Sequence, residues 1–377
     1  MAAEVVAAPP KKNLYASIYG SRKRAAFKSK PPQNITVKKP KLGCAFIQTD
    51  DDDDDEDDVS SKIIGRKYSS GMLNNNTGYQ SIDIIGSGTY GVVHKARHLK
   101  TGEIVAIKLQ FNGTSLSSFR ETDVLESLLP HPSIVRLKEV LVGNDFDDDD
   151  DEEDPVYIVM EYFESDLKKY IKSKKKDDEP FIIDPSEVKC LMKQLLEGVE
   201  FLHSNKLMHR DLKPGNILVN KDEKGMLNLK ICDFGMCRSF GSRSGLYTPS
   251  VGTSWYKSPE ILLGAKKYSS AVDMWSVGCI MAELFTGKAL FRGESELDQI
   301  KCVYRVLGTP NEDIWPGFTS LPGSVANFGQ LPCNLTRDEF PMLTRVGFDL
   351  LSKLLSYDPE NRITAEVALR HAWFEED

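Results

Sequence analysis

Acidic, amide and basic side chains stand at short, regular spacings near the middle of the chain. His209 to Asn216 has the sequence His-Arg-Asp-Leu-Lys-Pro-Gly-Asn, and Asp233 begins the run Asp-Phe-Gly. A carboxylate at Asp211 can accept the proton of a hydroxyl group, and the Lys213 ammonium can neutralise phosphate charge. Amide and carboxylate oxygens are ligands that Mg²⁺ prefers, so Asn216 and Asp233 are candidate metal ligands. The pattern predicts chemistry on phosphate groups.

A glycine-rich run lies upstream of these residues, from Gly86 to Val93, with the sequence Gly-Ser-Gly-Thr-Tyr-Gly-Val-Val. Glycines allow a backbone to turn tightly and to lie close over phosphate groups. Dinucleotide-binding folds use the same glycines, but there a helix follows them, whereas here the pattern predicts a strand on each side. The run therefore favours a loop that covers the phosphates of a nucleotide.

A lysine on the next predicted strand could reach those phosphates. Lys108 ends the run Val-Ala-Ile-Lys, and Glu121, on the predicted helix that follows, is the acidic residue best placed to hold it. Taken singly, Lys108 would suit an exposed strand and Glu121 a solvated helix. Their order after the glycine-rich run favours the phosphate-binding role.

The elements that position these residues begin at Tyr79. Five short runs with strand-like composition, separated by turn residues, predict a small antiparallel sheet. They are Ile82–Ile85, Gly91–Arg97, Ile104–Leu109, Ile134–Val142 and Val156–Glu161, and one helix, at about Ser118–Leu129, interrupts them.

Downstream of these strands, the apolar pattern becomes helical. One helix face is formed by Val188, Leu191, Met192, Leu195, Leu196, Val199 and Leu202. Asp184, Pro185 and Glu187 suit the N-cap, first-turn and third positions of that helix. The run Ala271–Thr286 is apolar nearly all round and precedes Gly287, which predicts a buried helix with a glycine stop.

These elements predict an α+β fold with three segments along the chain. Residues 1–78 are predicted to be a disordered extension, basic at first and then acidic, because neither helical nor strand periodicity occurs there. Residues 79–162 form a smaller β-rich lobe with an acidic insertion at 145–154. Residues 163–377 form a larger α-rich lobe.

The net charge of −8 conceals a basic protein. Two acidic runs, Asp50–Asp58 and Asp147–Asp154, contribute seventeen negative charges, so the rest of the chain carries +9. Like charges at this density repel one another and remain solvated. The second run is therefore expected to be a loop between the last two strands of the sheet.

Composition predicts an intracellular protein. No apolar run approaches the ~18 residues of a membrane span, and no signal-peptide pattern opens the chain. The seven cysteines are scattered and lack metal-ligand spacing, which predicts free thiols in a reducing compartment. Two basic clusters, Arg22–Arg24 and Lys38–Lys41, suit a nuclear import signal and a solvated tail equally. The nucleus is the predicted location, with the cytoplasm as the alternative.

In this order and at these spacings, the motifs resemble those of a eukaryotic protein kinase over Tyr79–Phe374. The resemblance implies a bilobal kinase fold that uses ATP and Mg²⁺, and Lys213 is typical of serine/threonine kinases. It implies three catalytic residues, Asp211, Lys213 and Thr253, and two metal ligands, Asn216 and Asp233. The ATP-binding residues that it implies are Ile85, Gly86, Ser87, Gly88, Thr89, Tyr90, Gly91, Val92, Val93, Ala106, Lys108, Glu121, Met160 as the gatekeeper, Glu161 and Phe163 in the hinge, and Leu218.

Further runs narrow the resemblance to the cyclin-dependent kinase family, and within it to the PITSLRE-type subgroup. These runs are Gly113–Glu121, which has the length and ending of the cyclin-binding helix signature, Tyr247-Thr248-Pro249, Ala271–Cys279, Leu297–Ile300 and Leu307–Pro310.

The resemblance also implies regulation and partners. It implies a cyclin partner, protein substrates with Ser or Thr sites, activating phosphorylation at Thr248, and inhibitory phosphorylation at Thr89 and Tyr90. Three arginines stand where this family binds the activating phosphate: Arg120, Arg210 and Arg238. Without a phosphate they are expected to form a like-charged cluster.

The segment Val251–Glu260 departs from the family pattern. It is Val-Gly-Thr-Ser-Trp-Tyr-Lys-Ser-Pro-Glu, where the family has Val-Val-Thr-Leu-Trp-Tyr-Arg-Ala-Pro-Glu. The resemblance implies that the family's arginine, at the position of Lys257, holds the backbone carbonyl at the position of Gly252 and so creates a pocket for proline. The lysine ammonium is a compact charge on a flexible stem, whereas the arginine guanidinium is a planar fork. Lys257 should therefore hold this carbonyl less firmly. We expect a weakened preference for proline after the phosphorylated residue.

Two other functions fit parts of the sequence. A catalytically weak or dead pseudokinase would use the fold as a binding scaffold, but such proteins typically lose a residue equivalent to Lys108, Asp211 or Asp233, and this chain has all three. Nucleic-acid binding by the basic extension would favour interleaved aromatic residues, which it lacks. No nucleic-acid or membrane partner is expected.

Overall fold

The computed structural model describes residues 77–88, 91–110, 116–142, 156–176, 180–240, 254–325 and 328–376, which all belong to one unit, Asp55–Asp377. Several predictions lie outside the described residues: those for the extension up to residue 76, for the insertion at 145–154, and for Thr89, Tyr90, Thr248 and Thr253. The division of the chain at residues 78 and 162 stays a prediction.

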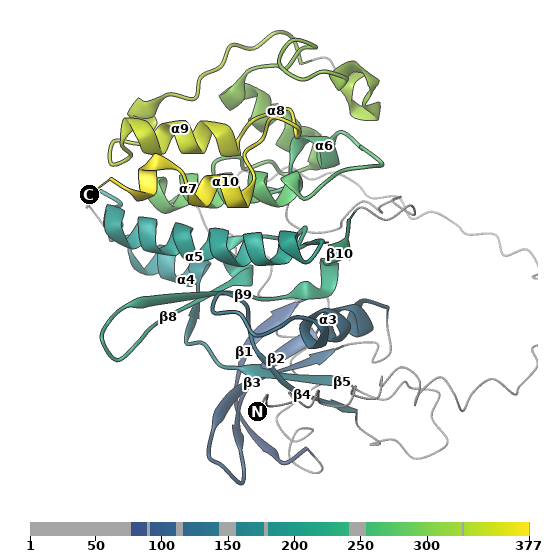
Figure 1. Cartoon of the computed structure of the whole chain (residues 1–377), viewed down its shortest axis with the longest axis vertical. Helices are drawn as coiled ribbons and strands as arrows, with labels where there is room; N and C mark the ends of the chain where they lie inside the picture. Colours follow the sequence, from purple (N-terminus) through teal and green to yellow (C-terminus); the bar gives the residue numbers. More distant parts are fainter. Residues whose placement is uncertain are drawn as a thin grey trace, which may run out of the picture. The chain divides into compact units, whose positions relative to one another are not determined.

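Five strands form an antiparallel sheet in the order β1-β2-β3-β5-β4, which confirms the predicted small sheet (Figure 1). Their bounds are β1 Tyr79–Gly88, β2 Gly91–His98, β3 Ile104–Gln110, β4 Leu137–Val142 and β5 Val156–Glu161. The predicted start of β4 at Ile134 is wrong. Ile134 is buried and forms a single bridge to Ile231, which lies outside this sheet, and pairing with β5 begins only at Leu137.

The two edge strands of this sheet meet at one point. Tyr79 on β1 donates its hydroxyl to the carboxylate of Glu139 on β4, although three strands lie between them. The twisted sheet therefore curls around a buried cluster, which consists of Tyr79, Ala96, Val105, Ile107, Leu109, Tyr157 and Val159. Because side chains alternate along a strand, Ala106, Lys108 and Gln110 lie on the opposite face of β3.

Helix α3, Leu116–Ser127, follows β3 and lies beside the sheet (Figure 1). It begins and ends two residues earlier than predicted, because no acidic residue in its first turn and no basic residue in its last turn marks its ends. Val124 and Leu125 pack into the main core, and Glu121 is buried as well.

The rest of the described chain is mostly helical, which confirms the α+β class. Its helices are α4 Leu167–Ser173, α5 Pro185–Ser204, α6 Pro259–Leu262, α7 Ala271–Thr286, α8 Glu296–Leu307, α9 Arg345–Leu354 and α10 Ala365–Leu369. Its short strands are β6 Ser165–Asp166, β7 Leu207–Met208, β8 Ile217–Lys221, β9 Leu227–Ile231 and β10 Arg238–Ser239, paired as β6-β8-β9 and β7-β10. None of the helices in the described ranges has the length and apolar character to cross a membrane.

Helix α5 has the apolar face that the sequence predicts, since all seven residues of that face are buried. At its start, Asp184 accepts a hydrogen bond from the backbone of Ser186, and Pro185 occupies the first turn. Glu187 stands at the third position, but its carboxylate accepts hydrogen bonds from Tyr170 and Lys174 and makes no cap.

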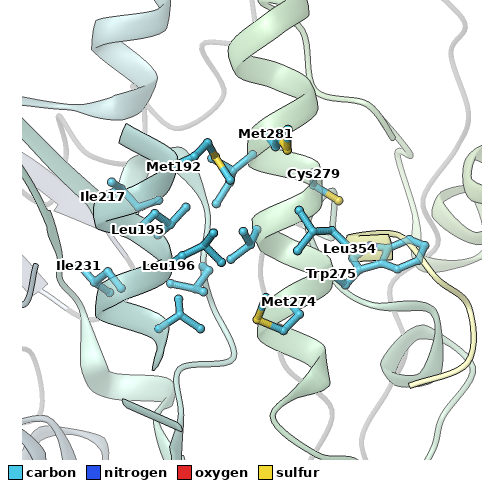
Figure 2. Close-up of a cluster of buried hydrophobic side chains, with 14 of the residues drawn as sticks. Met192, Leu195, Leu196, Ile217, Ile231, Met274, Trp275, Cys279, Met281 and Leu354 are labelled. Carbon is cyan, nitrogen blue, oxygen red and sulfur yellow. The ribbon is translucent and has the colours of Figure 1, made fainter. Parts of the chain in front are cut away.

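Helix α7 is buried along nearly its whole length and ends at Gly287, whose φ of 69° only glycine adopts easily, so this prediction is confirmed. Figure 2 shows α7 beside α5, with Trp275 and Leu354 on the side of α7 away from α5. This closely packed core holds the backbone segments that carry the polar residues of the site.

Candidate active site

A buried carboxylate from α7 fixes the run that begins at His209. Asp273 accepts hydrogen bonds from the backbone N–H groups of His209 and Arg210, each at 2.8 Å, and His203 Nε2 lies 2.9 Å from its Oδ2. Arg210 has a φ of 70°, a left-handed conformation that such a residue keeps only where its surroundings stabilise it. Burial alone would raise the pKa of Asp273, but its donors, with His203 first among them, lower it below its usual value. Asp273 therefore sets the backbone path into Asp211.

Two side chains of this run donate to one carboxylate oxygen of Asp211. Lys213 Nζ lies 3.0 Å from Asp211 Oδ2, and Asn216 Nδ2 lies 2.9 Å from the same oxygen. Asn216 Nδ2 also donates to the backbone carbonyl of Asp211, at 2.8 Å. Both side-chain contacts use Oδ2, and the side chain of Asp211 is 22% exposed, so its Oδ1 can accept a proton from a bound hydroxyl.

The run Asp-Phe-Gly is anchored to the same region. Phe234 is fully buried, and its ring meets the ring of His209 edge-on at a centroid distance of 5.2 Å. His209 Nε2 lies 3.0 Å from the backbone oxygen of Cys232. Asp233, between Cys232 and Phe234, has a φ of 63°, another left-handed conformation that the packing on both sides must hold. One network of contacts therefore fixes the backbone at both Asp211 and Asp233.

Lys108 lies between two carboxylates. Its Nζ is 2.8 Å from Glu121 Oε2 and 2.8 Å from Asp233 Oδ1. Burial alone lowers the pKa of Lys108, but Asp233 and Glu121 together raise it above its usual value, so the ammonium stays charged. Burial raises the pKa of Glu121, although Lys108 opposes this. Burial acts on Asp233 in the same direction, yet there the nearby ammonium prevails and lowers the pKa to about 2.

Asn216 and Asp233 offer oxygen atoms that could hold a cation. The amide nitrogen of Asn216 is used by Asp211, which leaves its carbonyl oxygen as a hard ligand. Within the described residues, no group of three or more His, Cys, Asp or Glu side chains could hold a metal by itself. A cation here would complete its shell with phosphate oxygens and water, as Mg²⁺ does. The donor set therefore fits Mg²⁺.

Most of the residues expected to bind the nucleotide lie on β1, β2, β3 and β5 of the five-stranded sheet, and Leu218 lies on another sheet. Ile85 to Gly88 end β1, Gly91 to Val93 begin β2, Ala106 lies on β3, Met160 and Glu161 end β5, Phe163 follows, and Leu218 lies on β8. Ala106 pairs with Met160 in the sheet register, so the gatekeeper position adjoins the lysine strand. A Cβ atom at Gly91 would lie 2.1 Å from the backbone oxygen of Leu109, so only glycine fits there.

Comparison with known proteins shows which family the chain belongs to. Residues 79–374 match the family model described as the protein kinase domain. The chain belongs to the protein kinase family. A protein kinase domain uses ATP.

Individual relatives place the kinase more narrowly. The chain is 50% identical over 315 residues to cyclin-dependent kinase G1 of Arabidopsis thaliana, 49% over 311 residues to cyclin-dependent kinase G-2 of Oryza sativa subsp. indica, and 47% over 305 residues to cyclin-dependent kinase 11B of Homo sapiens. These matches cover 79% of this chain and 49%, 41% and 36% of the respective relatives, so the kinase spans less than half the length of each. The resemblance to cyclin-dependent kinases is confirmed.

The hinge of the kinase is tied to the helical region behind it. Glu161 Oε1 accepts a hydrogen bond from the backbone N–H of Arg136 at 2.7 Å and lies 2.9 Å from Lys230 Nζ. Lys230 also donates to the backbone oxygen of Ile134. Both of these contacts of the Glu161 carboxylate use Oε1.

The three arginines expected to bind the activating phosphate converge on one short segment. Arg120 Nη1 donates to the backbone oxygen of Gly235 at 3.0 Å, and Arg210 Nε donates to that of Met236 at 2.7 Å. Arg238 Nη1 lies 3.5 Å from the oxygen of Cys237. Each of the three guanidinium groups therefore faces a backbone carbonyl dipole of the run Gly235–Cys237, and the like-charged cluster stays a prediction.

The end of the segment Val251–Glu260, which the structure describes from Ser254 on, is attached to the helical core. Tyr256 donates its hydroxyl to Glu283 on α7 at 2.7 Å, and the buried pair Arg362–Glu260 closes at 2.8 Å. Lys257 Nζ lies 3.6 Å from Glu296 Oε1, an acidic side chain at the start of α8. The ammonium of Lys257 is thus drawn toward α8.

Two residues without an assigned role in the sequence analysis contact this site. Asp273 stands in a run that was recognised only as a family signature, and Gln110 ends the lysine strand and reaches Glu121. The signal available for Gln110 was its spacing of two from Lys108, which places both side chains on one face of a strand.

Proposed function

We propose that the chain is an ATP-dependent protein serine/threonine kinase of the cyclin-dependent type. The observation that carries this proposal is that the structure contains two polar clusters, one around Asp211 and one around Lys108. Asp211 is held by Lys213 and Asn216, and Lys108 is held by Glu121 and Asp233.

Asp211 acts on the substrate hydroxyl. Its Oδ1 takes the proton as the hydroxyl oxygen bonds to the γ-phosphorus of ATP, while the bond from that phosphorus to the β–γ bridging oxygen breaks and ADP leaves. Lys213 lies beside the carboxylate and neutralises charge on the transferred group. Thr253 is the third catalytic residue of the proposal. The base and the neutralising cation are thus held 3.0 Å apart before the substrate arrives.

Lys108 contacts the α- and β-phosphates, and Glu121 keeps its ammonium directed into the pocket. Val93, Ala106 and Leu218 enclose the adenine, with the backbone of Glu161 and Phe163 as its hydrogen-bonding edge. We assign Asn216 and Asp233 to Mg²⁺, which neutralises phosphate charge when bound.

Regulation follows from the family and from the arginine positions. We propose that a cyclin binds beside α3, that phosphorylated Thr248 binds Arg120, Arg210 and Arg238, and that phosphorylation at Thr89 or Tyr90 inhibits. Arg120 and Arg210 donate to the neighbouring backbone oxygens of Gly235 and Met236, and a phosphate that reached them could accept from their remaining N–H groups. The substrates are proteins with Ser or Thr sites, and the nucleus is the proposed location.

Transfer of labelled γ-phosphate tests the proposal. The full chain, with Mg²⁺ and a basic protein substrate, is expected to place label on serine and threonine. Absence of transfer from protein phosphorylated at Thr248, with ATP still bound, would instead support the pseudokinase alternative.

A further inference from the structure

Gln110 provides a second donor to the glutamate that holds the active-site lysine. Its Nε2 lies 2.9 Å from Glu121 Oε2, the oxygen that also lies 2.8 Å from Lys108 Nζ. Lys108 and Gln110 alternate with Leu109 on β3, so both reach the same side of the strand. One carboxylate oxygen of α3 is therefore bound by two side chains of a single strand.

The buried cluster of Lys108, Glu121 and Asp233 has fewer positive than negative charges, so Glu121 needs a donor in addition to Lys108, and the Gln110 amide is that donor. The Lys108 ammonium is shared between Glu121 and Asp233, so one positive charge faces two carboxylates. Glu121 is only 1% exposed, so water cannot supply the missing donors. A neutral amide can donate to Glu121 without neutralising Asp233 and without competing for Lys108.

The hydrogen bond from Gln110 to Glu121 leaves the amide oxygen of Gln110 without a partner among the described residues. Gln110 Oε1 is buried and accepts no hydrogen bond from the residues that the structure describes. Turning the amide over would place that oxygen against the Glu121 carboxylate, so only the donating orientation is compatible with the pair. A purely apolar side chain would avoid the unpartnered oxygen but would also remove a donor to the buried Glu121 carboxylate, so what the glutamine contributes here is its bond to Glu121.

We propose that Gln110 is a positioning residue for phosphotransfer, which holds Glu121, and through it helix α3, in the place where Glu121 directs Lys108. The inference rests on the proposed function. When ATP draws Lys108 toward its phosphates, the Gln110 amide still binds Glu121 and keeps α3 in place. Gln110 itself touches neither nucleotide nor substrate.

A pair of glutamine substitutions tests the role. Gln110→Leu removes the donor at similar volume. Gln194→Leu is the matched control, because Gln194 is a partly buried glutamine of α5 whose amide is bonded to the backbone at Leu227 and Leu229 and not to Glu121. Gln110→Leu is expected to lower kcat/KM for ATP by about 10-fold, the size of one hydrogen bond to a charged group. Amide hydrogen exchange should rise within Leu116–Ser127, where Gln194→Leu changes nothing.

Comparing these two readouts, hydrogen exchange and kcat/KM, separates the possible failures. Exchange in α3 needs no phosphotransfer, so a wild-type chain without kinase activity, but with the exchange difference, refutes the proposed function and retains only the part of the inference in which Gln110 holds Glu121 and α3. Unchanged exchange in α3 and unchanged kcat/KM in Gln110→Leu overturn the role. If Gln110→Leu does not fold, Gln110→Met, which also lacks the donor, is measured with the same expected and overturning results.

Discussion

Replacing Asp273 by asparagine should damage both stability and catalysis, because this buried carboxylate carries the backbone of the catalytic run. Its Oδ1 accepts the Arg210 N–H, and its Oδ2 accepts the His209 N–H and contacts His203 Nε2. An asparagine keeps one acceptor oxygen and places an amino group where the other oxygen was. At least one backbone donor then loses its acceptor in a site without exposure to water.

The magnitude follows from that count. A hydrogen bond to a charged group contributes about 1.5–3 kcal/mol, so Asp273→Asn should lower the free energy of unfolding by about 2–3 kcal/mol. Because the released N–H adjoins Asp211, the base should shift relative to the γ-phosphate, and kcat should fall by at least about 10-fold.

Urea unfolding and kcat at saturating ATP measure the two effects. The matched control is Asp349→Asn, since Asp349 is an exposed carboxylate paired with Lys353 and His371, and its loss should change stability by less than about 1 kcal/mol. If Asp273→Asn has the stability and kcat of the Asp349 variant, the proposed support of the catalytic run is wrong.

Three further predictions concern other parts of the kinase. Ser258 has a buried hydroxyl without a hydrogen-bond partner among the described residues, so Ser258→Ala should raise the free energy of unfolding by about 1 kcal/mol in urea, and a loss of stability would contradict this. Burial lowers the pKa of His94, so the unfolded chain binds more protons, and stability should fall as the pH drops below about 6.5. His94→Asn should show a smaller loss between pH 7 and pH 5, and an equal loss would assign the effect to other groups. Lys257→Arg should sharpen the selection for proline after the phosphorylated residue in a peptide library, because a planar fork holds a carbonyl better than an ammonium drawn to Glu296. An unchanged preference would refute that explanation.

The sequence allowed the strands, the long helices and the ordered motifs to be predicted, because each depends on residues close together in the chain. The apolar face of α5 repeats every three or four residues, and Lys108 is recognisable from its own strand. The ends of α3 were displaced by two residues, since no charged residue of the expected sign marks its first or last turn.

Contacts between distant segments could not be predicted in the same way. Asp273 reaches back 63 residues to Arg210, and Asp233 shares Lys108 across 125 residues. No local pattern encodes such distances, and the alternation that places Gln110 beside Lys108 says nothing of α3, which Gln110 contacts. The hinge pair Glu161–Lys230 escaped prediction for the same reason, because its partners belong to different sheets.

The role of Asp211 is the central claim, and the transfer rate of Asp211→Asn tests it most directly. The rate of γ-phosphate transfer and the affinity for ATP are measured together in the wild-type chain and in this variant. Asparagine retains the size of the side chain but cannot take the hydroxyl proton, so the rate should fall by about 100-fold or more, as expected for loss of a general base. The affinity for ATP should change little, because Lys108, Asp233 and the hinge remain. A variant that transfers phosphate at the wild-type rate would contradict the account.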